Sequence, residues 1–396
     1  MRKTIIVTII VLSCCRINAQ TFTGTVYDKA TNQPISGVYV SFNGTVAYTI
    51  TDNLGKFELT VAQRLNTQLV FSHIAYNMVI IENPFDKLPE EIYMEERVNM
   101  LDDVVVSARQ LAEYADPFTR AQKLKTFREQ FLGTTRAGKS CFIMNEADLE
   151  LRYSVQTNTL YASSDNPIVV VNEYLGYMVS FTLLDFRIEY AVQLEISGTG
   201  KSPSLSGGRL TSGELQELRA QGRELTNTEL QELRAQREGM SALQLHSTSR
   251  SYNIQRSYFT VISLFTDLSP DDRKIKSRRD DVYEQSSTNF FKNIANNTLG
   301  KSNFRIHKDR RNVVDQSLYF AIEDDDTFSL KTIRFIPESG SIINVRYRNK
   351  PSNIQFLTDT LLVDRYGNID KFDKVLFTGV MGESRAGDML PVDYEP

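Results

Sequence analysis

The chain has 396 residues, with 45 basic and 49 acidic side chains, a net charge of −4 and no tryptophan. A mildly acidic chain lacks the clustered positive surface that nucleic-acid binding requires, so we expect no nucleic-acid partner. Its length and its 41% content of hydrophobic residues are sufficient for about two or three domains with their own cores.

The first 19 residues have the pattern of a cleaved signal peptide. Arg2 and Lys3 precede an apolar run at 5–12, and Ala19 supplies a small residue before the expected cleavage point. The apolar run is too short to span a bilayer. We therefore expect an exported protein, in the periplasm or associated with the outer membrane of a Gram-negative bacterium.

The cysteines bear on the same question. Loss of residues 1–19 removes three basic residues, which leaves 42 against 49 acidic ones, and leaves one cysteine, Cys141. A single cysteine forms no internal disulfide and no thiolate zinc site. Because Cys141 lies in a strand-like apolar run, we interpret it as a buried thiol and not as a nucleophile. Cys14 and Cys15 leave open the alternative of a lipoprotein signal, which ends at a cysteine that carries lipid.

Residues 20–98 have the sequence pattern of an all-β domain. Short runs rich in β-branched and aromatic residues alternate with turn sequences such as Asn43-Gly44. The predicted strands are 22–27, 38–42, 47–51, 57–61, 69–72, 78–81 and 91–94. Seven short strands in so short a stretch predict a β-sandwich.

Three groups of residues in this domain carry a resemblance to a known family. They are Gly24-Thr25-Val26, then Asn32 to Pro34 with Gly37-Val38, and then Thr51-Asp52 with Gly55 and Phe57. These groups resemble the carboxypeptidase-regulatory-like, transthyretin-type domain found at the front of many exported bacterial proteins. The resemblance implies a seven-stranded Ig/transthyretin-like β-sandwich, in which Pro34 bends the chain between strands and Gly55 reaches positive φ in a hairpin turn.

The resemblance to a carboxypeptidase-associated domain does not bring a zinc ligand set with it. His73, His246 and His307 have no Glu or His at metal-ligand spacing, and we interpret each as a structural or surface residue. The turn at 52–55 could hold a cation through its oxygen atoms, but a plain tight turn explains it without a metal. The sequence predicts no cofactor and no metal, and it identifies no catalytic residue.

Residues 100–108 follow the sandwich and resemble the segment that joins the same module to the plug of TonB-dependent outer-membrane receptors. Such a receptor needs a plug and a barrel of about twenty strands. Only 288 residues follow Ala108, and they lack a series of lipid-facing strands. We therefore expect an N-terminal region that resembles that of the receptors, without their plug and barrel. The alternative for 101–108 is an edge strand that leads into the next domain.

A linker at 99–120 leads into a second domain at 121–396, which begins with a helix at 119–132. Its predicted strands are 141–144, 149–155, 159–163, 168–172, 177–184, 186–197, 330–335, 342–347, 354–357, 360–363 and 375–377. The spacing favours an antiparallel meander. The fold class is thus mainly β with an α+β second half, in which a larger antiparallel-sheet domain carries a few helices. This half is similar to regions that follow the regulatory-like module in exported proteins of unassigned function, and the similarity implies no activity.

An insertion is predicted at 198–240. Its start, Ser197 to Ser202, is similar to the end of a P-loop, but Glu195 replaces a required glycine and Pro203 stands where the phosphate-binding helix should begin. We therefore interpret 198–208 as a flexible loop without a nucleotide.

The insertion also contains a repeat of period 15. The segments 210–224 and 225–239 share the sequence ELQELRAQ. Each copy has capping-box spacing at its start, which predicts a short helix. The repeat is either a duplicated insertion that lies over the sheet or a helical hairpin that binds a partner.

Two charged segments follow. Ser277 and Asp280 predict a capped helix with one apolar face, which consists of Val282, Ser286, Phe290 and Ile294. We expect the basic residues beside this cap to form a solvated helix start; they are Lys274, Lys276, Arg278 and Arg279. The run at 323–326 is predicted to be an acidic loop tip, with calcium binding as the alternative.

These observations favour a non-enzymatic cell-envelope protein that binds or scaffolds. We expect its partner to be an envelope protein or polymer, with peripheral association to the outer membrane and no transmembrane helix after signal cleavage. The alternative is a hydrolase of cell-wall or carbohydrate polymers that acts through a carboxylate pair, although no spacing identifies that pair.

Overall fold

The computed structural model describes residues 19–97, 116–196, 248–309, 312–325 and 330–396. These residues belong to two compact units. The first unit takes its described residues from 1–152, 162–186 and 259–396, and the second takes its own from 153–161 and 187–258.

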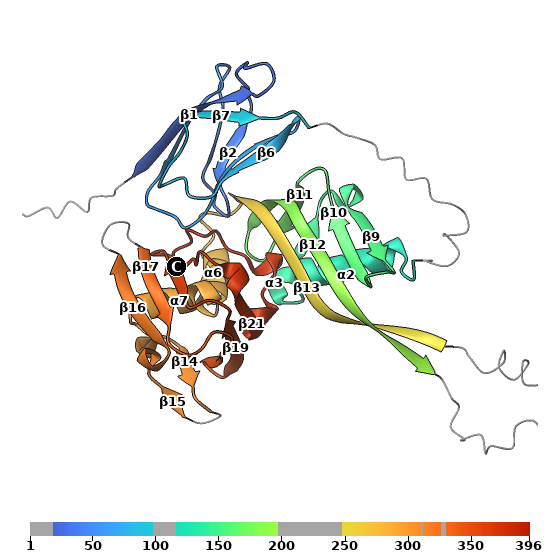
Figure 1. Ribbon diagram of the computed structural model, residues 1–396, viewed down its shortest axis with the longest axis vertical. Coiled ribbons are helices and arrows are strands. Elements are labelled where there is room, and N and C mark those ends of the chain that lie inside the picture. The colour runs from blue at the N-terminus through green and yellow to red at the C-terminus, as the bar shows by residue number, and fades with distance from the viewer. Residues whose placement is uncertain (1–18, 98–115, 197–247, 310–311, 326–329) are drawn as a thin grey trace, which may run out of the picture. The chain divides into compact units, whose positions relative to one another are not determined.

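The first unit begins with a sandwich of two sheets (Figure 1). One sheet has the strand order β4-β1-β7 and the other has the order β3-β2-β5-β6. The strands are β1 (Gln20–Asp28), β2 (Tyr39–Phe42), β3 (Tyr48–Ile50), β4 (Lys56–Val61), β5 (Leu69–His73), β6 (Tyr76–Ile81) and β7 (Glu91–Met94). Each of the seven predicted strands overlaps one of these, so the predicted sandwich is confirmed.

Alternation of polar and apolar residues builds the core of the sandwich. Along β4 every second residue is buried, so Phe57, Leu59 and Val61 face inward. The Phe57 ring contacts Phe71 of the opposite sheet edge-to-face, with 5.3 Å between ring centroids. The same buried cluster includes Tyr366, which comes from the C-terminal part of the chain. The core of the sandwich is therefore completed by a distant segment.

The turn between β3 and β4 depends on Gly55, as the sequence predicts. Gly55 has a φ of +72°, a conformation that favours glycine. A Cβ atom at this position would lie 2.6 Å from the carbonyl oxygen of Val26, because the Val26 N–H donates to the Gly55 carbonyl at 2.8 Å. Both the conformation and the available space therefore require glycine.

Backbone hydrogen bonds join the sandwich to two later segments of the first unit. The Gly44 N–H donates to the Ser263 carbonyl at 2.7 Å, and the Gly44 carbonyl accepts from the Val392 N–H at 2.8 Å. The Thr45 carbonyl accepts from the Phe265 N–H at 2.9 Å. The turn after β2 is therefore paired with a strand and with a C-terminal segment, and this contact holds the sandwich in addition to its chain connection.

Asp364 supplies a second junction through a carboxylate that is only 3% exposed. Its Oδ1 accepts from the backbone N–H groups of Tyr366, Gly367 and Asn368, each at 2.9 Å. Its Oδ2 accepts from the Asn66 N–H of the sandwich at 3.1 Å and from Asn368 Nδ2 at 2.9 Å. Burial raises the pKa of the Asp364 carboxyl, and the hydrogen bonds lower it by less. One carboxylate thus binds a loop of the sandwich to a turn far along the chain.

The next region of the chain contains two helices and an antiparallel sheet. Its elements are α2 (Arg120–Phe131), α3 (Arg136–Lys139), β8 (Cys141–Ile143), η1 (Glu146–Asp148), β9 (Glu150–Ser154), β10 (Thr159–Ser163), β11 (Ile168–Asn172), β12 (Tyr177–Ile196) and β13 (Thr248–Asp267). The strand order is β8-β11-β12-β10-β9, and β13 also pairs with β12. Thr119 and Gln122 form the capping box of α2, which confirms the predicted helix.

The two strands predicted at 177–184 and 186–197 are one strand, β12. Leu184 and Asp185 are both exposed, which interrupts the alternation of the sequence without interrupting the backbone. The first part of β12 pairs with β11, where Phe181 lies opposite Ile168, and a later part pairs with β10. A change of partner therefore explains the change of pattern.

The second unit contains a cluster of three tyrosines. The rings of Tyr153, Tyr190 and Tyr252 contact one another edge-to-face, with centroid distances of 5.9, 6.2 and 6.4 Å. The guanidinium of Arg187 lies over the ring of Tyr258, at 5.0 Å from its centroid.

Two helices replace the single helix predicted near residues 277–294. The first, α6 (Arg273–Glu284), is capped by Asp272, whose carboxylate accepts from the N–H groups at positions 274 and 275. The second, α7 (Ser287–Ala295), is capped by the hydroxyl of Ser286. The predicted cap Ser277 was wrong, because an aspartate ahead of the first turn already satisfies the free N–H groups. The predicted apolar face is correspondingly broken: Phe290 and Ile294 are buried, but Val282 is not.

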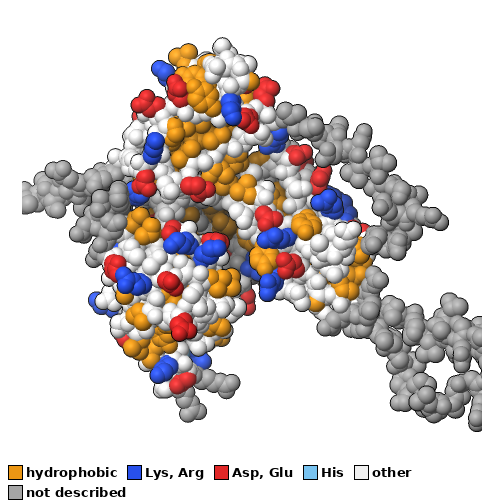
Figure 2. Space-filling model, in the orientation of Figure 1, with side chains coloured by type: hydrophobic (Ala, Val, Ile, Leu, Met, Phe, Trp, Pro, Cys, Tyr) orange, Lys and Arg blue, Asp and Glu red, His pale blue; other side chains and the backbone are white. Residues whose placement is uncertain are grey.

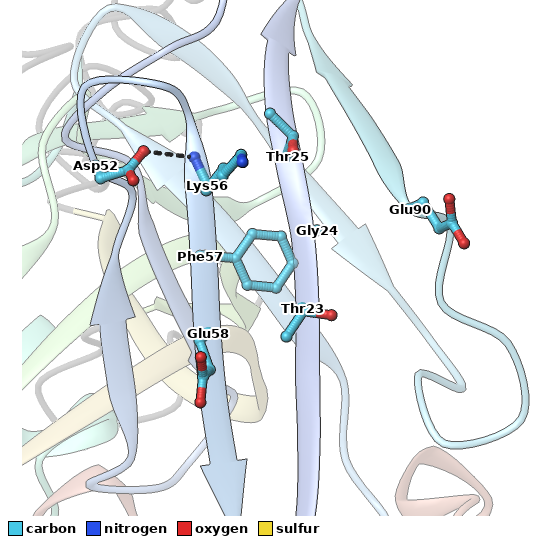
Figure 3. A pocket seen from close by; sticks show the side chains of 8 residues that line it. All are labelled: Thr23, Gly24, Thr25, Asp52, Lys56, Phe57, Glu58 and Glu90. Carbon is cyan, nitrogen blue, oxygen red and sulfur yellow. Dashed lines mark hydrogen bonds between the residues drawn. The ribbon is translucent and has the colours of Figure 1, made fainter.

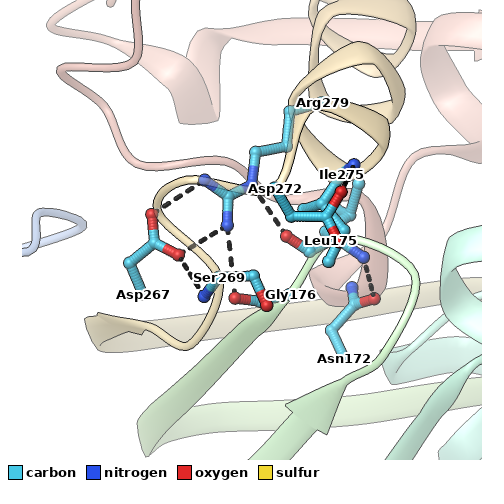
Figure 4. Close-up of polar contacts among 8 residues, drawn as sticks. All are labelled: Asn172, Leu175, Gly176, Asp267, Ser269, Asp272, Ile275 and Arg279. Carbon is cyan, nitrogen blue, oxygen red and sulfur yellow. Dashed lines mark hydrogen bonds and ion pairs between the residues drawn. The ribbon is translucent and has the colours of Figure 1, made fainter.

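Arg279 was predicted to be solvated, but it is buried, with 5% exposure. It donates to both carboxylate oxygens of Asp267, at 2.8 and 2.7 Å (Figure 4). Its Nε donates to the Leu175 carbonyl at 2.8 Å, and its Nη2 also donates to the Gly176 carbonyl at 3.2 Å. The guanidinium lies 3.8 Å from the centroid of the Tyr177 ring. The planar fork of arginine suits these acceptors, whereas a lysine offers a single point of charge.

Two pKa values are shifted near the pair of Asp267 and Arg279. Burial raises the pKa of Asp267, but the hydrogen bonds from Arg279 and from the Ser269 N–H, together with the charge of Arg279, lower it further than burial raises it. Burial raises the pKa of Tyr177 to about 12. The carboxylate of Asp267 is therefore stabilised in its charged form.

The C-terminal part of the first unit contains two antiparallel sheets packed around α7. Its elements are η2 (Leu299–Lys301), β14 (Phe304–His307), β15 (Val313–Val314), η3 (Gln316–Leu318), β16 (Phe320–Asp325), β17 (Leu330–Phe335), β18 (Ile342–Tyr347), β19 (Lys350–Phe356), β20 (Thr360–Val363), η4 (Phe372–Lys374), β21 (Val375–Gly379), α8 (Val380–Glu383) and η5 (Ala386–Asp388). The strand orders are β15-β14-β18-β19-β21 and β16-β17-β20. The shared core includes Phe290, Phe291, Phe304 and Phe356. The predicted mainly β fold with a few helices is confirmed.

The acidic run at 323–326 was predicted as a loop tip, but its described residues, 323–325, lie in β16. Glu323 is opposite Thr332 of β17 and forms an ion pair with Arg334. Phe320 and Ile322 continue the same ladder, which extends the strand into the acidic residues.

We expect Gly55→Ala to lower the free energy of unfolding by about 2 kcal/mol, because the side chain would need a positive φ and would meet the Val26 carbonyl. Gly300→Ala is the matched control, since a Cβ there meets nothing within 4 Å. Urea denaturation of the two variants measures the difference. Equal stabilities would contradict the structure of this turn.

We expect Asp364→Asn to cost about 3 kcal/mol of stability, because the new amide group would face backbone donors that the carboxylate now satisfies. The control is Asp370→Asn, whose carboxylate accepts a single backbone bond, from the Leu362 N–H at 2.9 Å. Chemical denaturation should show a loss of about 1 kcal/mol or less for the control. If Asp370→Asn is as destabilised as Asp364→Asn, the Asp364 carboxylate contributes no more to stability than a carboxylate with one backbone hydrogen bond.

We expect Asp267→Asn to cost about 3 kcal/mol at pH 7, because it leaves the charge of buried Arg279 without its partner. Since the pKa of Asp267 is lower in the folded state than in the unfolded state, its contribution is complete above about pH 4 and is lost as the pH falls further. The gap between wild type and variant should therefore narrow at pH 3. Asp281→Asn, at an exposed position of α6, should show no such pH-dependent gap. A stability difference between wild type and Asp267→Asn that does not change with pH would contradict the ion pair of Asp267 with Arg279.

Candidate functional site

A groove of about 530 Å³ lies on the outer side of the sandwich (Figure 3). It is lined by Thr23, Gly24, Thr25, Asp52, Lys56, Phe57, Glu58 and Glu90. Figure 3 shows the residues of β4 and of the turn before it on one side of β1, and Glu90 on the other side.

The antiparallel register of β1 and β4 places the lining residues. Thr23 lies opposite Glu58, and Thr25 lies opposite Lys56, so these four side chains share the face that points away from the core. Between them Gly24 lies opposite Phe57, whose ring faces the core. The groove therefore has polar side chains as walls and a strand ladder as its floor.

Most polar side chains of the groove have no partner among the residues that the structure describes. Among the residues that the structure describes, none forms a hydrogen bond or an ion pair with the side chain of Thr23, Lys56 or Glu58. The same holds for the carboxylate of Glu90. Three carboxylates accompany one ammonium group in the lining, so the groove suits a ligand that donates hydrogen bonds or carries positive charge.

The carboxylate of Asp52 has a structural role at the end of the groove. Its Oδ1 accepts from the Leu54 N–H at 2.8 Å and from the Lys56 N–H at 2.9 Å. These are the bonds of a tight turn closed by an aspartate side chain. A turn of this kind accounts for Asp52 without a cation.

The polar face continues beyond the groove to a pair of tyrosines. Tyr27 of β1 and Tyr93 of β7 are opposite each other and stack, with 5.7 Å between ring centroids. Tyr93 is 42% exposed, and its hydroxyl donates to the carboxylate of Glu91 at 2.9 Å. Figure 2 shows acidic and basic side chains interspersed over the visible face of the molecule, with no broad basic area there.

Of the three histidines singled out in the sequence, the structure describes His73 and His307. The His73 ring contacts Tyr76 edge-to-face and its Nδ1 accepts from the Ala75 N–H at 3.2 Å. His307 lies in β14, and its buried Nδ1 has no hydrogen-bond partner within the described ranges. His246 lies outside the described residues. Across the described part of the chain, no group of three or more His, Cys, Asp or Glu side chains could hold a metal ion.

Cys141 is half-buried at the start of β8, whereas the sequence suggested a buried thiol. Its Sγ donates to the Ala137 carbonyl at 3.3 Å. Burial, and to a smaller extent the charge of Asp388, raises the pKa of the thiol to about 12. A thiol with so high a pKa is a poor nucleophile at neutral pH.

The carboxylate of Asp388 is also engaged. Its Oδ1 accepts from Thr135 Oγ1 at 2.7 Å, and the same hydroxyl accepts from the Gly138 N–H at 3.0 Å. Burial raises the pKa of Asp388, and its hydrogen bonds lower it by less. The contact fastens η5 to α3, which is a structural use of the carboxyl group.

Several sequence features fall outside the described residues. They are the signal pattern with Cys14 and Cys15, the receptor-like segment at 100–108, the sequence similar to a P-loop and the repeat at 210–239. The description of the candidate site does not draw on them.

Sequence reasoning did not find the groove, although a signal for it was present. The threonines at 21, 23 and 25 alternate with Phe22 and with Gly24, which marks one face of β1 as polar and hydroxyl-bearing. What the sequence does not show is the register of β1 with β4, which brings Lys56 and Glu58 to the same face.

The family comparison concerns the part of the chain that holds this groove. The model of the CarboxypepD_reg-like domain matches residues 22–106, which include nearly all of the sandwich. No curated protein matches the chain. No described helix is long and apolar enough to cross a membrane. The chain therefore carries a CarboxypepD_reg-like domain at its N-terminal end, as the resemblance implied.

Proposed function

We propose that the protein is a non-enzymatic binding or scaffolding protein of the cell envelope, and that it binds through the outer face of its CarboxypepD_reg-like domain. The observation that carries this proposal is the groove on β1 and β4, in which the side chains of Thr23, Lys56, Glu58 and Glu90 have no partner among the described residues. Free polar groups arranged on a rigid sheet are suited to recognition.

The junctions of the sandwich support a scaffolding role. The bonds of Gly44 with Ser263 and Val392, and those of Asp364 with Asn66, fix the domain to the rest of the first unit. A force applied to a ligand in the groove would thus be transmitted to a folded body. A domain that anchors a protein to a partner needs this property.

The proposed location rests on the signal pattern at residues 1–19 and on the exported proteins that share the resemblance. The expected cleavage point precedes Gln20, which is also the first residue of β1. Export would therefore deliver a chain that begins with the sandwich.

We expect full-length protein expressed in a Gram-negative bacterium to be processed before Gln20 and to be recovered from the periplasm or the outer-membrane fraction. N-terminal sequencing and fractionation measure this. Ile6→Arg, which interrupts the apolar run of the signal, should keep the chain unprocessed in the cytoplasm. A change of the two cysteines Cys14 and Cys15 to serine should leave processing unchanged, unless the signal is that of a lipoprotein.

The purified processed protein should then sediment with isolated envelopes, and its binding should weaken when Glu58→Lys reverses one charge of the groove. Glu129→Lys, at an exposed position of α2, is the control. Turnover of a cell-wall or carbohydrate polymer, abolished by a single Asp or Glu substitution, would instead establish the hydrolase. Unprocessed wild-type protein in the cytoplasm would overturn the proposed location.

A further inference from the structure

The strand β1 is paired on both sides along only part of its length. It pairs with β4 from Gln20 to Thr25, whereas its parallel partner β7 begins opposite Thr25. The stretch 20–24 therefore has β4 on one side and no strand on the other within the described part of the chain.

The direction of the backbone groups at this edge follows from bonds farther along β1. The Thr25 N–H donates to the Glu90 carbonyl at 2.9 Å, and the Lys29 N–H donates to the Met94 carbonyl at 2.9 Å. Odd-numbered residues of β1 thus direct their N–H and C=O groups toward the β7 side. Because backbone directions alternate along a strand, Thr21 and Thr23 direct theirs to the same side, where β7 is absent.

These four backbone groups have no hydrogen-bond partner among the described residues. Thr21 and Thr23 are both exposed, and no described residue bonds to their N–H or C=O groups on that side. An exposed strand edge with free N–H and C=O groups is a template for another strand. Natural proteins use such edges to bind extended peptides, since the main chain supplies affinity and neighbouring pockets supply specificity.

The surroundings of this edge select the charge of the added strand. The groove borders the edge, with Glu90 on the open side of β1 and Glu58 on the far side over β4 (Figure 3). Lys56 is the one basic residue of the lining. Side chains of an added strand that point to the outer face would therefore meet an excess of carboxylates, which favours lysine or arginine.

We propose that the edge of β1 at residues 20–24 binds an extended basic segment of a partner protein by strand addition. The inference rests on the proposed function and names its partner as a peptide segment with lysine or arginine at alternate positions. The free edge spans about five residues, or ~17 Å, so the contact is short and its affinity is modest.

The test uses the processed full-length protein and a synthetic peptide, KVKTKVK, with both ends blocked. We expect saturable binding by titration calorimetry, and protection of the Thr21 and Thr23 amides from hydrogen exchange. The peptide EVETEVE, with the same pattern and the opposite charge, should bind at least about tenfold more weakly.

The matched variants are Thr23→Pro and Thr60→Pro. Thr23→Pro removes a donor from the proposed edge, and proline is tolerated in an edge strand where the N–H faces solvent. Thr60 lies opposite Thr21 on β4, so its N–H faces away from β1, on the other edge of the same sheet. Its hydroxyl is 2.8 Å from that of Thr21, so Thr60→Pro also tests whether loss of this side-chain contact alone affects binding. We expect Thr23→Pro to weaken peptide binding about tenfold and Thr60→Pro to leave it unchanged.

Circular dichroism and thermal unfolding establish that both variants are folded. If either variant does not fold, Glu90→Lys with Glu129→Lys as control tests the same edge through charge alone. Equal binding by Thr23→Pro and wild type, or loss of binding in Thr60→Pro alone, would overturn the assignment of the edge, and equal binding of the two peptides would overturn the choice of a basic partner. Envelope binding that persists without peptide binding contradicts this inference alone, whereas peptide binding by a protein that is never exported contradicts the proposed function alone.

Discussion

The buried carboxylate of Asp364 is the interaction on which the arrangement of the first unit depends. It accepts hydrogen bonds from three successive N–H groups of its own turn and from the Asn66 N–H, which is 298 residues earlier in the chain. Removing a carboxylate from water is costly unless its oxygens are satisfied, and here the donors of two segments satisfy them together. Neither segment offers this set of donors without the other.

Arg279 illustrates the same rule for a positive charge. Its guanidinium meets the two oxygens of Asp267, two backbone carbonyls and the face of Tyr177. The groove on the sandwich shows the opposite condition, because the side chains of Lys56, Glu58 and Glu90 find no partner among the described residues. The charges of Asp364 and Arg279 are thus saturated by the protein, whereas the groove presents charges that no described residue engages.

The sequence predicted the strands well and the charged side chains poorly. Strands such as β4 are visible because alternation of Phe57, Leu59 and Val61 with polar residues is a local property. The burial of Arg279 is not local, since it depends on Asp267 and on two carbonyls of the turn between β11 and β12. The cap of α6 was missed because Ser277 and Asp272 both have capping chemistry, and only the path of the chain decides between them. The groove needed the register of β1 with β4, which no single strand contains.

The junction at Gly44 has a consequence for the order of events during synthesis. The sandwich is made first, and its core strands are close in sequence, so it can begin to fold early. Its buried cluster nevertheless includes Tyr366, and Gly44 accepts from the Val392 N–H. The ribosome must therefore make the chain beyond Val392 before the sandwich acquires these contacts. A nascent chain that stalls before residue 366 would display the unfinished side of the domain to chaperones and proteases.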